Sequence, residues 1–491
     1  MSTAIPHNGA RMTPSEMATA TSGVLRMHGA PVREIVGLAS DSRNVVPGCA
    51  FVALRGEKYD GHDFLRPAIE NGAALVVTAQ PGEPVFDALL VPDTLVAWGD
   101  LARAHLRKWR RLHNASRPAR TVAITGSAGK TTTKDMCAAL LALVAPTHAT
   151  AGNLNNRVGV PAVAFGVEAE HRFAVFEAGM SVPGEMASLG GILEPDVAVL
   201  LNVGVAHAGG VGGGRAEIAR EKGALLEALP RIGCAVVNAD DELASAQLVR
   251  ARAEHRETFG RSDAARYRLV ERVPCGRLGS RLIVERPRGS GRERISVVLP
   301  VPGEAAALDF VAALAAAEAA HGEPISAELL GARAPLLSIT PGRAMIRTLA
   351  GNVVVFDDSY NANPASMRAA LETVFEIART DQRRFVAVLG EMKELGALAE
   401  QEHEALGDVL GQCNVSLAIG CGGLIDLTLD RAASRGTRVF KARSTEQAAE
   451  AALGEVQAGD VVLLKGSRST GVELVLRALQ QLHGIVAAVE R

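Results

Sequence analysis

The 491-residue sequence is poor in aromatic side chains, which make up 3% of it, and it has almost no excess of either charge. Lysine and arginine number 52 against 54 aspartate and glutamate residues, so the formal net charge is −2. A general nucleic-acid-binding protein usually shows a strong basic excess and aromatic side chains on which bases stack. We therefore expect no nucleic-acid partner.

Cysteines are few, and long uncharged apolar runs are absent. The six cysteines are scattered, with no CxxC pair and no Cys/His spacing typical of a zinc site. This pattern favours free thiols in a reducing, cytoplasmic environment. The opening segment, residues 1–17, has no apolar core, so we expect no secretory signal there. No uncharged apolar run approaches the roughly 20 residues that span a bilayer, so we expect no membrane insertion.

Hydrophobic residues make up 48% of the sequence, which is enough for large cores. At roughly 150 residues per domain, the length suggests about three domains. Predicted strands alternate with predicted helices along most of the chain, which indicates an α/β protein. We expect a small N-terminal α/β domain over residues 1–97, a central domain over 98–337 and a C-terminal domain over 338–491. Residues 1–12 look like a loose tail.

Local patterns support this division. A capping box at Thr13-Pro14-Ser15-Glu16 predicts a helix that runs to about His28. The apolar runs FAVFEAG and DVAVLLNVG are typical of parallel strands covered on both faces. Residues 250–300 are rich in arginine and contain short alternating strands, which predicts an antiparallel flap on the central domain. Alternating strands and helices after residue 343 predict a C-terminal Rossmann-like sheet.

A basic helix is expected from Val96 to about His113. Its charges are consistent with either a nucleic-acid patch or a solvated helix face, and the neutral overall charge favours the solvated face. The basic residues are Arg103, Arg107, Lys108, Arg110 and Arg111.

A glycine-rich loop lies between a predicted strand, TVAIT, and a predicted helix. It consists of Gly126, Ser127, Ala128, Gly129, Lys130, Thr131 and Thr132. In this context the sequence indicates a phosphate-binding P-loop, in which backbone N–H groups approach phosphate oxygens, Lys130 adds a cation and the Thr131 hydroxyl can bind Mg²⁺. The strict pattern has glycine at position 124, where this chain has Ile124. The alternative is a chance glycine-rich turn.

Two further candidates follow neighbouring strands of the central domain. Glu177 ends the strand FAVFE, and His207 lies in the glycine-rich segment AHAGGVGGG after the next strand. Ligands of open α/β sheets gather at the carboxyl edge, which suits Mg²⁺ binding. A loop-capping glutamate and a surface histidine are the alternatives.

Lys222 falls on the apolar stripe of the helix predicted over Arg215–Leu229, in line with Ile218 and Leu225. One interpretation is a lysine that extends along the helix to reach water. The other is a partly buried amine with a lowered pKa, which is open to covalent modification.

The C-terminal domain places polar residues at two strand ends. Asp357 and Asp358 precede a segment with Asn361 and Asn363, and a second strand ends in Lys465-Gly466-Ser467-Arg468. The two cations, Lys465 and Arg468, suit an anionic substrate. A cleft between the central and C-terminal domains, which closes over nucleotide and substrate, is therefore expected.

Taken together, these segments resemble the Mur ligase family over nearly the whole chain. The resemblance is carried by SDSRNVVPGCAFVALRGEKYDGHDF, TGSAGKTTTKD, TAGNLNNRVGVP, FEAGMSVPGEM, NVGVAHAGG, IAREKGALLEAL, DDSYNANPASM, LGEMKELG and LLKGSRS. DDSYNANPASM and KGSRS are similar to the family member that adds a dipeptide. The member that adds diaminopimelate would carry a DNPR segment, which this chain lacks.

The resemblance implies an ATP-dependent ligase of peptidoglycan synthesis that acts through an acyl phosphate. Its implied substrates are UDP-N-acetylmuramoyl-tripeptide and D-alanyl-D-alanine, its implied cofactor is Mg²⁺, and the protein would be a monomer. It also implies residue roles: Lys130, His207 and Lys222 in catalysis; Thr131, Glu177, His207 and a carbamate on Lys222 at the metal; Arg343 and Asp358 at ATP; Ser42 and Arg43 near UDP; Asn155 and Asn156 near the cleft.

One segment departs from the family pattern, which is PG-x-H-N-x-x-N-A before the last central helix. Here the histidine and first asparagine are replaced by Ala305 and Ala306, and Asp309 stands at the second asparagine. Two other functions therefore stay open: a Mur-type ligase that adds a single amino acid, and a nucleotide-binding regulatory module without ligase chemistry.

Overall fold

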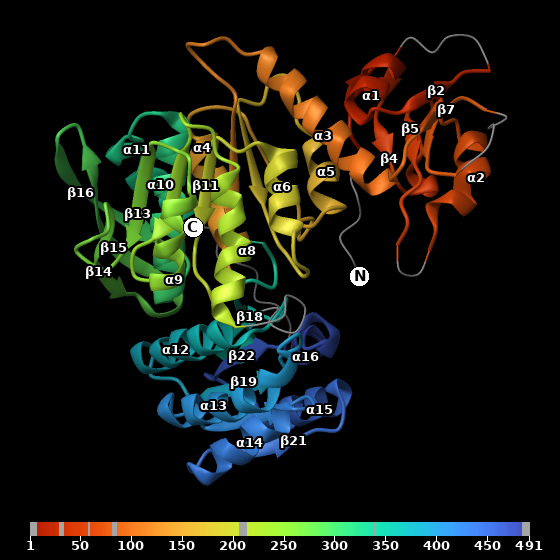
Figure 1. Cartoon of the computed structure of the whole chain (residues 1–491). Helices are drawn as coiled ribbons and strands as arrows, with labels where there is room; N and C mark the ends of the chain where they lie inside the picture. Colours follow the sequence, from red (N-terminus) through yellow and green to blue (C-terminus); the bar gives the residue numbers. More distant parts are fainter. Residues whose placement is uncertain are drawn as a thin grey trace.

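The computed structural model describes residues 7–28, 34–56, 59–80, 86–205, 214–337 and 340–483. It confirms the α/β fold: three largely parallel sheets follow one another along the chain, each flanked by helices (Figure 1). Within these ranges no helix is long and apolar enough to cross a membrane. We keep the boundaries at 97/98 and 337/338 as a proposal, and each sheet falls within one of the three proposed domains.

The N-terminal sheet has five strands in the order β2-β7-β6-β5-β4, parallel except for the β2–β7 pair. Its strands are β2 (Val24–Arg26), β4 (Leu38–Ala39), β5 (Ala50–Val52), β6 (Leu75–Thr78) and β7 (Ala88–Leu90). Its helices are α1 (Pro14–Thr21), α2 (Leu65–Glu70) and the short 3₁₀ turns η1 (Ser42–Asn44) and η2 (Gly61–Phe64).

Two N-terminal expectations need correction. The capping box is confirmed, because Thr13 and Glu16 bond reciprocally, but the helix ends at Thr21 rather than near residue 28. Ser22 adopts a left-handed φ of 53°, which stops the helix and turns the chain into β2. The loose tail is also wrong in part, since Arg11–Met12 forms β1, which pairs with β3 (Ile35–Val36).

The central sheet has nine strands in the order β16-β15-β14-β13-β12-β11-β8-β10-β9. These are β8 (Arg120–Thr125), β9 (Thr147–Ala149), β10 (Phe173–Glu177), β11 (Val197–Leu200), β12 (Cys234–Asn238), β13 (His255–Gly260), β14 (Tyr267–Pro274), β15 (Ser280–Arg288) and β16 (Gly291–Leu299).

Helices cover both faces of the central sheet. Side chains of α4 (Lys130–Ala142) and α10 (Glu304–His321) pack on one face. Those of α5 (Gly159–Ala164), α6 (Glu185–Leu193) and α8 (Arg215–Glu227) pack on the other. The described part of the domain also contains the short helical segments α9 (Glu242–Ser245), η3 (Ala246–Arg250), α11 (Ala327–Arg333) and η5 (Ala334–Leu336).

The antiparallel flap begins later than residue 250 and is not a separate sheet. β13 still pairs in parallel with β12 and with β14, and only the β14–β15 and β15–β16 pairs are antiparallel. The strands therefore extend the central sheet. The turn η4 (Gly276–Leu278) joins β14 to β15.

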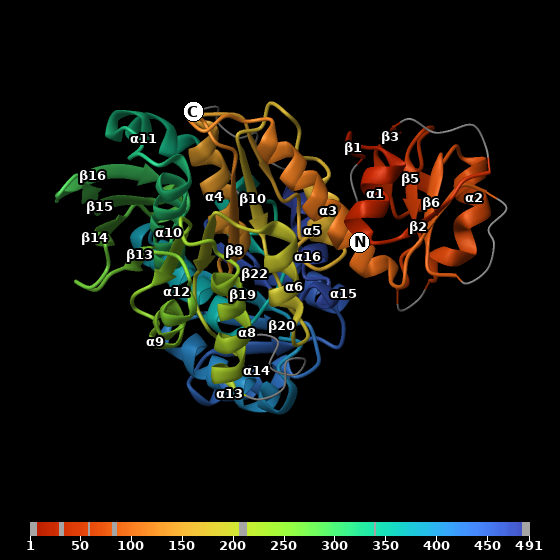
Figure 2. The same ribbon diagram turned by 45° about the horizontal axis from the view of Figure 1, so that its top comes forward.

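The basic helix is α3 (Thr94–Arg111), which joins the N-terminal domain to the central domain (Figure 2). Arg107 and Arg111 are exposed, as a solvated helix face predicts, and most of the basic side chains are also ion-paired. Arg107 bonds to Glu194, and Arg110 donates to the carbonyls of Leu193 and Glu194. The indole of Trp98, on the same helix, donates to the carbonyl of Val158 at 2.9 Å. The helix is therefore anchored to the central domain on one side and has a solvent-exposed basic face on the other.

The C-terminal sheet has the order β17-β18-β22-β19-β20-β21, with only β17 antiparallel. Its strands are β17 (Met345–Leu349), β18 (Val353–Asp358), β19 (Phe385–Leu389), β20 (Leu417–Gly420), β21 (Arg438–Lys441) and β22 (Val461–Lys465). Side chains of α12 (Pro364–Thr380), α13 (Ala399–Gln412) and α14 (Ile425–Ser434) cover one face. Those of α15 (Thr445–Glu455) and α16 (Glu473–His483) cover the other. The apolar strands predicted from the sequence are confirmed, and β17 was missed.

A buried ion pair ties the flap to α10. Arg286 of β15 is fully buried and bonds to Glu318 of α10, which is 4% exposed. Glu318 also accepts hydrogen bonds from the Tyr267 hydroxyl at 2.9 Å and from the Ile325 N–H at 3.0 Å. A charge removed from water is tolerated only when such partners surround it.

We predict that Glu318→Gln lowers the free energy of unfolding of the central domain by about 3 kcal/mol, because Arg286 keeps its charge and loses its most buried partner. The matched control is Glu254→Gln, which removes an exposed partner of Arg231 and should cost less than about 1 kcal/mol. Urea unfolding followed by circular dichroism measures both. Equal losses in the two variants would contradict the prediction.

Candidate active site

A cavity of about 960 Å³ lies between the central and C-terminal domains, at the carboxyl ends of their parallel strands. Its walls include the whole loop Ser127–Thr132, the strand end Glu177, the segment Val301–Asp309 in part, and the C-terminal residues around Asp358 and Lys465. Ligands of open α/β sheets bind at this kind of edge. The cleft expected from the sequence is therefore present.

The P-loop runs from the end of β8 into α4. Gly129 has a φ of +83°, and a Cβ there would lie 2.3 Å from Asp309 Oδ1, so only glycine fits. The Oδ1 atom of Asn202 accepts the N–H groups of Ser127 at 3.0 Å and Ala128 at 2.9 Å. The first N–H groups of α4 have no partner within the helix and border the cavity, which makes them available to phosphate oxygens.

A buried set of oxygen atoms lies beside the loop. The Thr131 hydroxyl donates to Glu177 Oε2 at 2.7 Å, and Asn155 Nδ2 donates to Glu177 Oε1 at 2.6 Å. Glu177 is 1% exposed. A carboxylate and a hydroxyl at the foot of a phosphate site are the donor types that Mg²⁺ prefers, so the residues present fit this ion. The described ranges contain no cluster of three or more His, Cys, Asp or Glu residues suited to a metal.

Two lysines share one backbone oxygen. Lys130 Nζ donates to the Gly126 carbonyl at 2.9 Å, and Lys222 Nζ donates to the same oxygen at 3.2 Å. Burial lowers the pKa of Lys222 well below its usual value, and the charge of Lys130 lowers it further against the opposing pull of Glu221. Burial also lowers the pKa of Lys130. The partly buried amine considered from the sequence is thus the observed state, and Lys222 does not extend to water.

The C-terminal wall contributes a second buried pair. Lys465 bonds to Asp358 Oδ2 and donates to the carbonyl of Asn361 at 2.9 Å. Asp358 Oδ1 accepts the N–H of Ala344 at 3.1 Å, which fixes the chain next to Arg343. Burial lowers the pKa of Lys465, although Asp358 opposes this effect. Both residues are held in position before any ligand binds.

Two arginines stack on one aromatic ring in the same wall. The guanidinium of Arg343 lies 4.1 Å from the ring centre of Tyr360, and that of Arg468 lies 5.5 Å from it. Both arginines line the cavity and suit anionic groups. Asn363 bridges the two domains, since its Nδ2 donates to the carbonyl of Ser127 at 3.1 Å.

The segment that departs from the Mur ligase pattern forms part of the cavity wall. Ala305, Ala306 and Asp309 all line it, next to the P-loop. Removal of the carboxyl group from bulk water raises the pKa of Asp309 to about 8. At neutral pH the acid at this position is therefore mainly uncharged, as an asparagine would be.

The remaining sequence candidates differ in their placement. Asn156 borders the cavity, and its Oδ1 accepts the N–H groups that begin α5. Ser42 and Arg43 lie in η1 of the N-terminal domain, outside the described lining of the cavity, and Arg43 bonds to Asp41. His207 lies outside the described residues.

Sequence reasoning missed three contributors. Asn202 shapes the P-loop, although the segment NVG after β11 marked the correct strand end. Tyr360 supports the two arginines, although it lies inside a quoted segment. Asp135 of α4 accepts hydrogen bonds from the N–H and hydroxyl of Thr340, which ties the chain entering the C-terminal domain to the P-loop helix. That last contact joins residues too far apart in sequence for any local pattern to indicate.

Comparison with known proteins gives consistent results. Three family models match: the Mur ligase middle domain over residues 124–317, the Mur ligase glutamate ligase domain over 342–468, and the Mur ligase family catalytic domain over 34–96. The UDP-N-acetylmuramoyl-tripeptide–D-alanyl-D-alanine ligase of Escherichia coli is 34% identical over 446 residues, 90% of this chain and 93% of that protein. The enzyme of the same name from Bacillus subtilis is 30% identical, covering 91% of this chain and 92% of that protein.

Solved structures agree. The crystal structure of MurF from Acinetobacter baumannii matches with a TM-score of 0.84 and 29% identity, covering 96% of this chain and 99% of that one. The MurF ligase of Thermotoga maritima in complex with ADP matches with a TM-score of 0.76 and 27% identity, covering 90% and 97%. The family resemblance inferred from the sequence is confirmed: the chain belongs to the Mur ligase family.

Proposed function

We propose that this protein is the ATP-dependent ligase that joins D-alanyl-D-alanine to UDP-N-acetylmuramoyl-tripeptide, a cytoplasmic step of peptidoglycan synthesis. The observation that carries the proposal is one cavity in which the P-loop and the Thr131–Glu177 pair face Asp358 and Lys465 of the C-terminal domain. Lys222 is bonded to the Gly126 carbonyl of the same loop. Similarity over at least 90% of the chain to ligases of that name supports it.

The chemistry requires activation, because the joining of a carboxylate to an amine in water is unfavourable. ATP would transfer its terminal phosphoryl group to the tripeptide carboxylate, with release of ADP. The amine of the dipeptide would then attack the acyl phosphate and expel phosphate. Lys130 and the N–H groups at the start of α4 would stabilise the negative charge on the transferring phosphoryl group. Fixed hydrogen-bond donors that position the phosphoryl group would be the main catalytic contribution of this site.

Thr131 and Glu177 would hold Mg²⁺, which would supply positive charge to the phosphate oxygens. Lys222 fits a carbamate for a structural reason, since a second ammonium group beside Lys130 on the Gly126 carbonyl is unfavourable. A neutral amine can react with carbon dioxide, and the resulting anion would face Lys130. His207 is retained as a proposed metal residue on the family resemblance alone.

The UDP moiety would extend beyond the cavity, whose described lining contains no residue of the N-terminal domain. We assign Ser42 and Arg43 of that domain as its contacts. The dipeptide and acyl-phosphate end would lie against the C-terminal wall, where Asn361, Asn363, Lys465 and Arg468 present amides and cations. We also propose that the enzyme acts as a cytoplasmic monomer without nucleic-acid partners.

A coupled assay of ADP release tests this proposal. Purified protein is incubated with Mg·ATP and UDP-N-acetylmuramoyl-tripeptide, and each candidate amine is added in turn. We expect turnover with D-alanyl-D-alanine and none with free amino acids or glutamate. The Lys130→Ala variant should lose roughly 10²–10³-fold in rate, because one phosphate-stabilising donor is removed. Turnover with a single amino acid indicates another Mur-type ligase, and ATP binding without product indicates a regulatory module.

We predict that Lys222→Ala abolishes ligation and that added short carboxylic acids, such as acetate or formate, restore part of it. The added acid would supply the missing anion in the space vacated by the lysine. ADP release measured against acid concentration checks this, with chloride at equal ionic strength as the control. Full activity of the variant without added acid would remove Lys222 from the site.

We predict that affinity for ATP falls as the pH rises from 7 to 9, by up to about tenfold, because Asp309 loses its proton near pH 8 and its charge then repels phosphate. Asp309→Asn should remove this component, since an amide stays neutral. The control is Asp263→Asn, at an exposed position paired with Arg268. Calorimetric titration with Mg·ATP at pH 7, 8 and 9 measures the slopes. Identical slopes for wild type and Asp309→Asn would refute the prediction.

A further inference from the structure

Helix α12 of the C-terminal domain contacts the central domain near both of its ends. Its 17 residues span about 25 Å. At its start, Asn363 bonds to the P-loop carbonyl of Ser127. In its last turns, Glu376 bonds to Arg272 of the flap, and the residue that ends it, Asp381, accepts a hydrogen bond from Arg277 at 3.0 Å. The helix is therefore held to the P-loop at one end and to the flap at the other.

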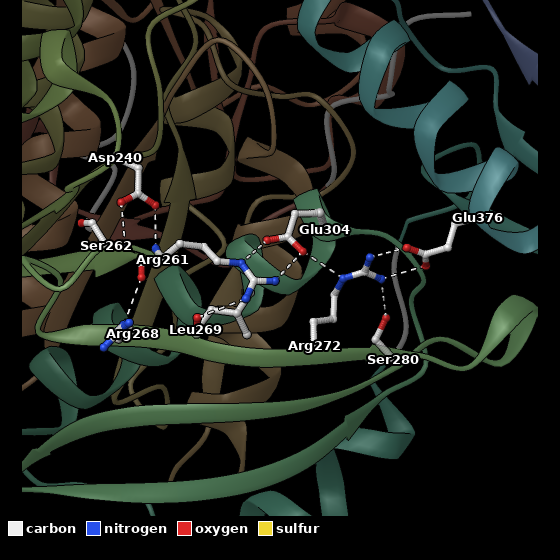
Figure 3. Close-up of polar contacts among 9 residues, drawn as sticks. All are labelled: Asp240, Arg261, Ser262, Arg268, Leu269, Arg272, Ser280, Glu304 and Glu376. Atoms are coloured by element: carbon white, nitrogen blue, oxygen red, sulfur yellow. Dashed lines mark hydrogen bonds and ion pairs between the residues drawn. The ribbon is translucent and has the colours of Figure 1, made fainter. Parts of the chain in front are cut away.

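Arg272 is the centre of the flap contact (Figure 3). Its Nη1 atom lies 2.9 Å from Glu376 Oε1, and its Nη2 atom bonds to the other carboxylate oxygen. On the central-domain side, its Nε atom lies 2.9 Å from Glu304 Oε2 and its Nη1 atom 3.1 Å from Ser280 Oγ. The Arg272 side chain is only 9% exposed, and that of Glu376 is 16% exposed. Arg272 and Glu376 therefore form a bidentate, largely buried ion pair, which is stronger than an ordinary surface ion pair.

The Arg272–Glu376 pair is linked to the cavity wall through Glu304, which is also charged. Glu304 is also held by Arg261, whose Nη2 atom lies 2.7 Å from Glu304 Oε2. Burial alone would raise the pKa of Glu304, but the two arginines outweigh it and lower the pKa. Arg261 is held in turn by Asp240, which accepts its backbone N–H at 2.6 Å (Figure 3). Glu304 immediately precedes Ala305 of the cavity wall, so the flap contact and the cavity share one turn of α10.

Two glycines allow the domains to approach closely. A Cβ on Gly303 would lie 2.3 Å from Thr373 Oγ1 of α12, and a Cβ on Gly276 would lie 2.0 Å from Asp381 Oδ1. Both glycines have positive φ, +98° and +58°. The interface therefore depends on the shape of the backbone as well as on charge.

The two domains keep separate hydrophobic cores on either side of this contact. The residues of α10 pack in the central core and those of α12 pack in the C-terminal core. The contact can therefore open without unfolding of either domain, as hinge movements between domains require.

We propose that Arg272 and Arg277 of the flap are positioning residues that latch α12 to the central domain and so hold Asn363 and the C-terminal wall against the P-loop. The latch lowers the cost of assembling the cavity, because a domain that is already docked does not have to be ordered by the substrates. Neither arginine lines the cavity, so the latch acts by positioning the domains and not by contact with the reacting groups.

Small-angle X-ray scattering on the full chain without nucleotide tests the latch independently of any activity. Wild type should match the compact arrangement described here. Glu376→Gln, Arg272→Met and the double variant should each show an increased radius of gyration, and the double variant should not exceed the larger single effect. The control is Glu372→Gln on the same helix, whose carboxylate is exposed and 4.0 Å from Arg368. An open wild type, or a Glu376→Gln variant as compact as wild type, would overturn the proposal.

A kinetic measurement, which rests on the proposed function, separates positioning from a general structural role. A latch defect reduces the population of the assembled state, so the KM for ATP should rise about 5- to 150-fold while kcat at saturation stays close to wild type. Loss of kcat with unchanged KM would contradict the latch. Absence of ligation by wild type would refute the proposed function. The latch would then be tested by the scattering experiment alone.

Discussion

The carbonyl oxygen of Gly126 accepts hydrogen bonds from both Lys130 and Lys222, and this shared acceptor constrains the rest of the site. Two charged ammonium groups beside one buried carbonyl repel each other, so the doubly charged state is unfavourable. The arrangement is balanced only when one amine is neutral or modified and when anions occupy the adjoining cavity. A nucleotide phosphate chain on the N-terminus of α4, with Glu177 beside it, satisfies that requirement.

The fold brings these groups together because three of them are attached to neighbouring parallel strands. β8 leads into the P-loop, β10 ends in Glu177, and β11 leads to Asn202, which fixes the loop. The C-terminal sheet presents its own carboxyl edge, with Asp358 at the end of β18 and Lys465 at the end of β22. Helix α12 and the chain around Thr340 hold the two edges against each other. The catalytic cavity is thus a property of domain docking as much as of either domain.

Much of this could be predicted from the sequence, where the signal was local. Lys222 was recognisable because a lysine on an apolar helical stripe must either be buried or extend along the helix, and the P-loop was recognisable from its strand–glycine–helix context. Contacts between distant segments left no such signal: Asn363 with Ser127, Asp135 with Thr340, and Arg272 with Glu376. The loose tail and the overlong first helix were wrong because strand pairing and a left-handed residue at Ser22 override local propensity. The structure places most of the predicted site residues at one cavity, but the role of each of them, and of Ser42, Arg43 and His207, stays a prediction.

The most direct test of phosphoryl transfer follows an ¹⁸O label from the substrate carboxylate into inorganic phosphate. If the terminal phosphoryl group is transferred to the substrate acid at the P-loop, one carboxylate oxygen must leave with the phosphate when the amine attacks. Tripeptide nucleotide labelled with ¹⁸O in its terminal carboxylate, turned over with Mg·ATP and D-alanyl-D-alanine, should yield inorganic phosphate that carries one ¹⁸O atom, detected by mass spectrometry. Product formation with unlabelled phosphate would contradict the account.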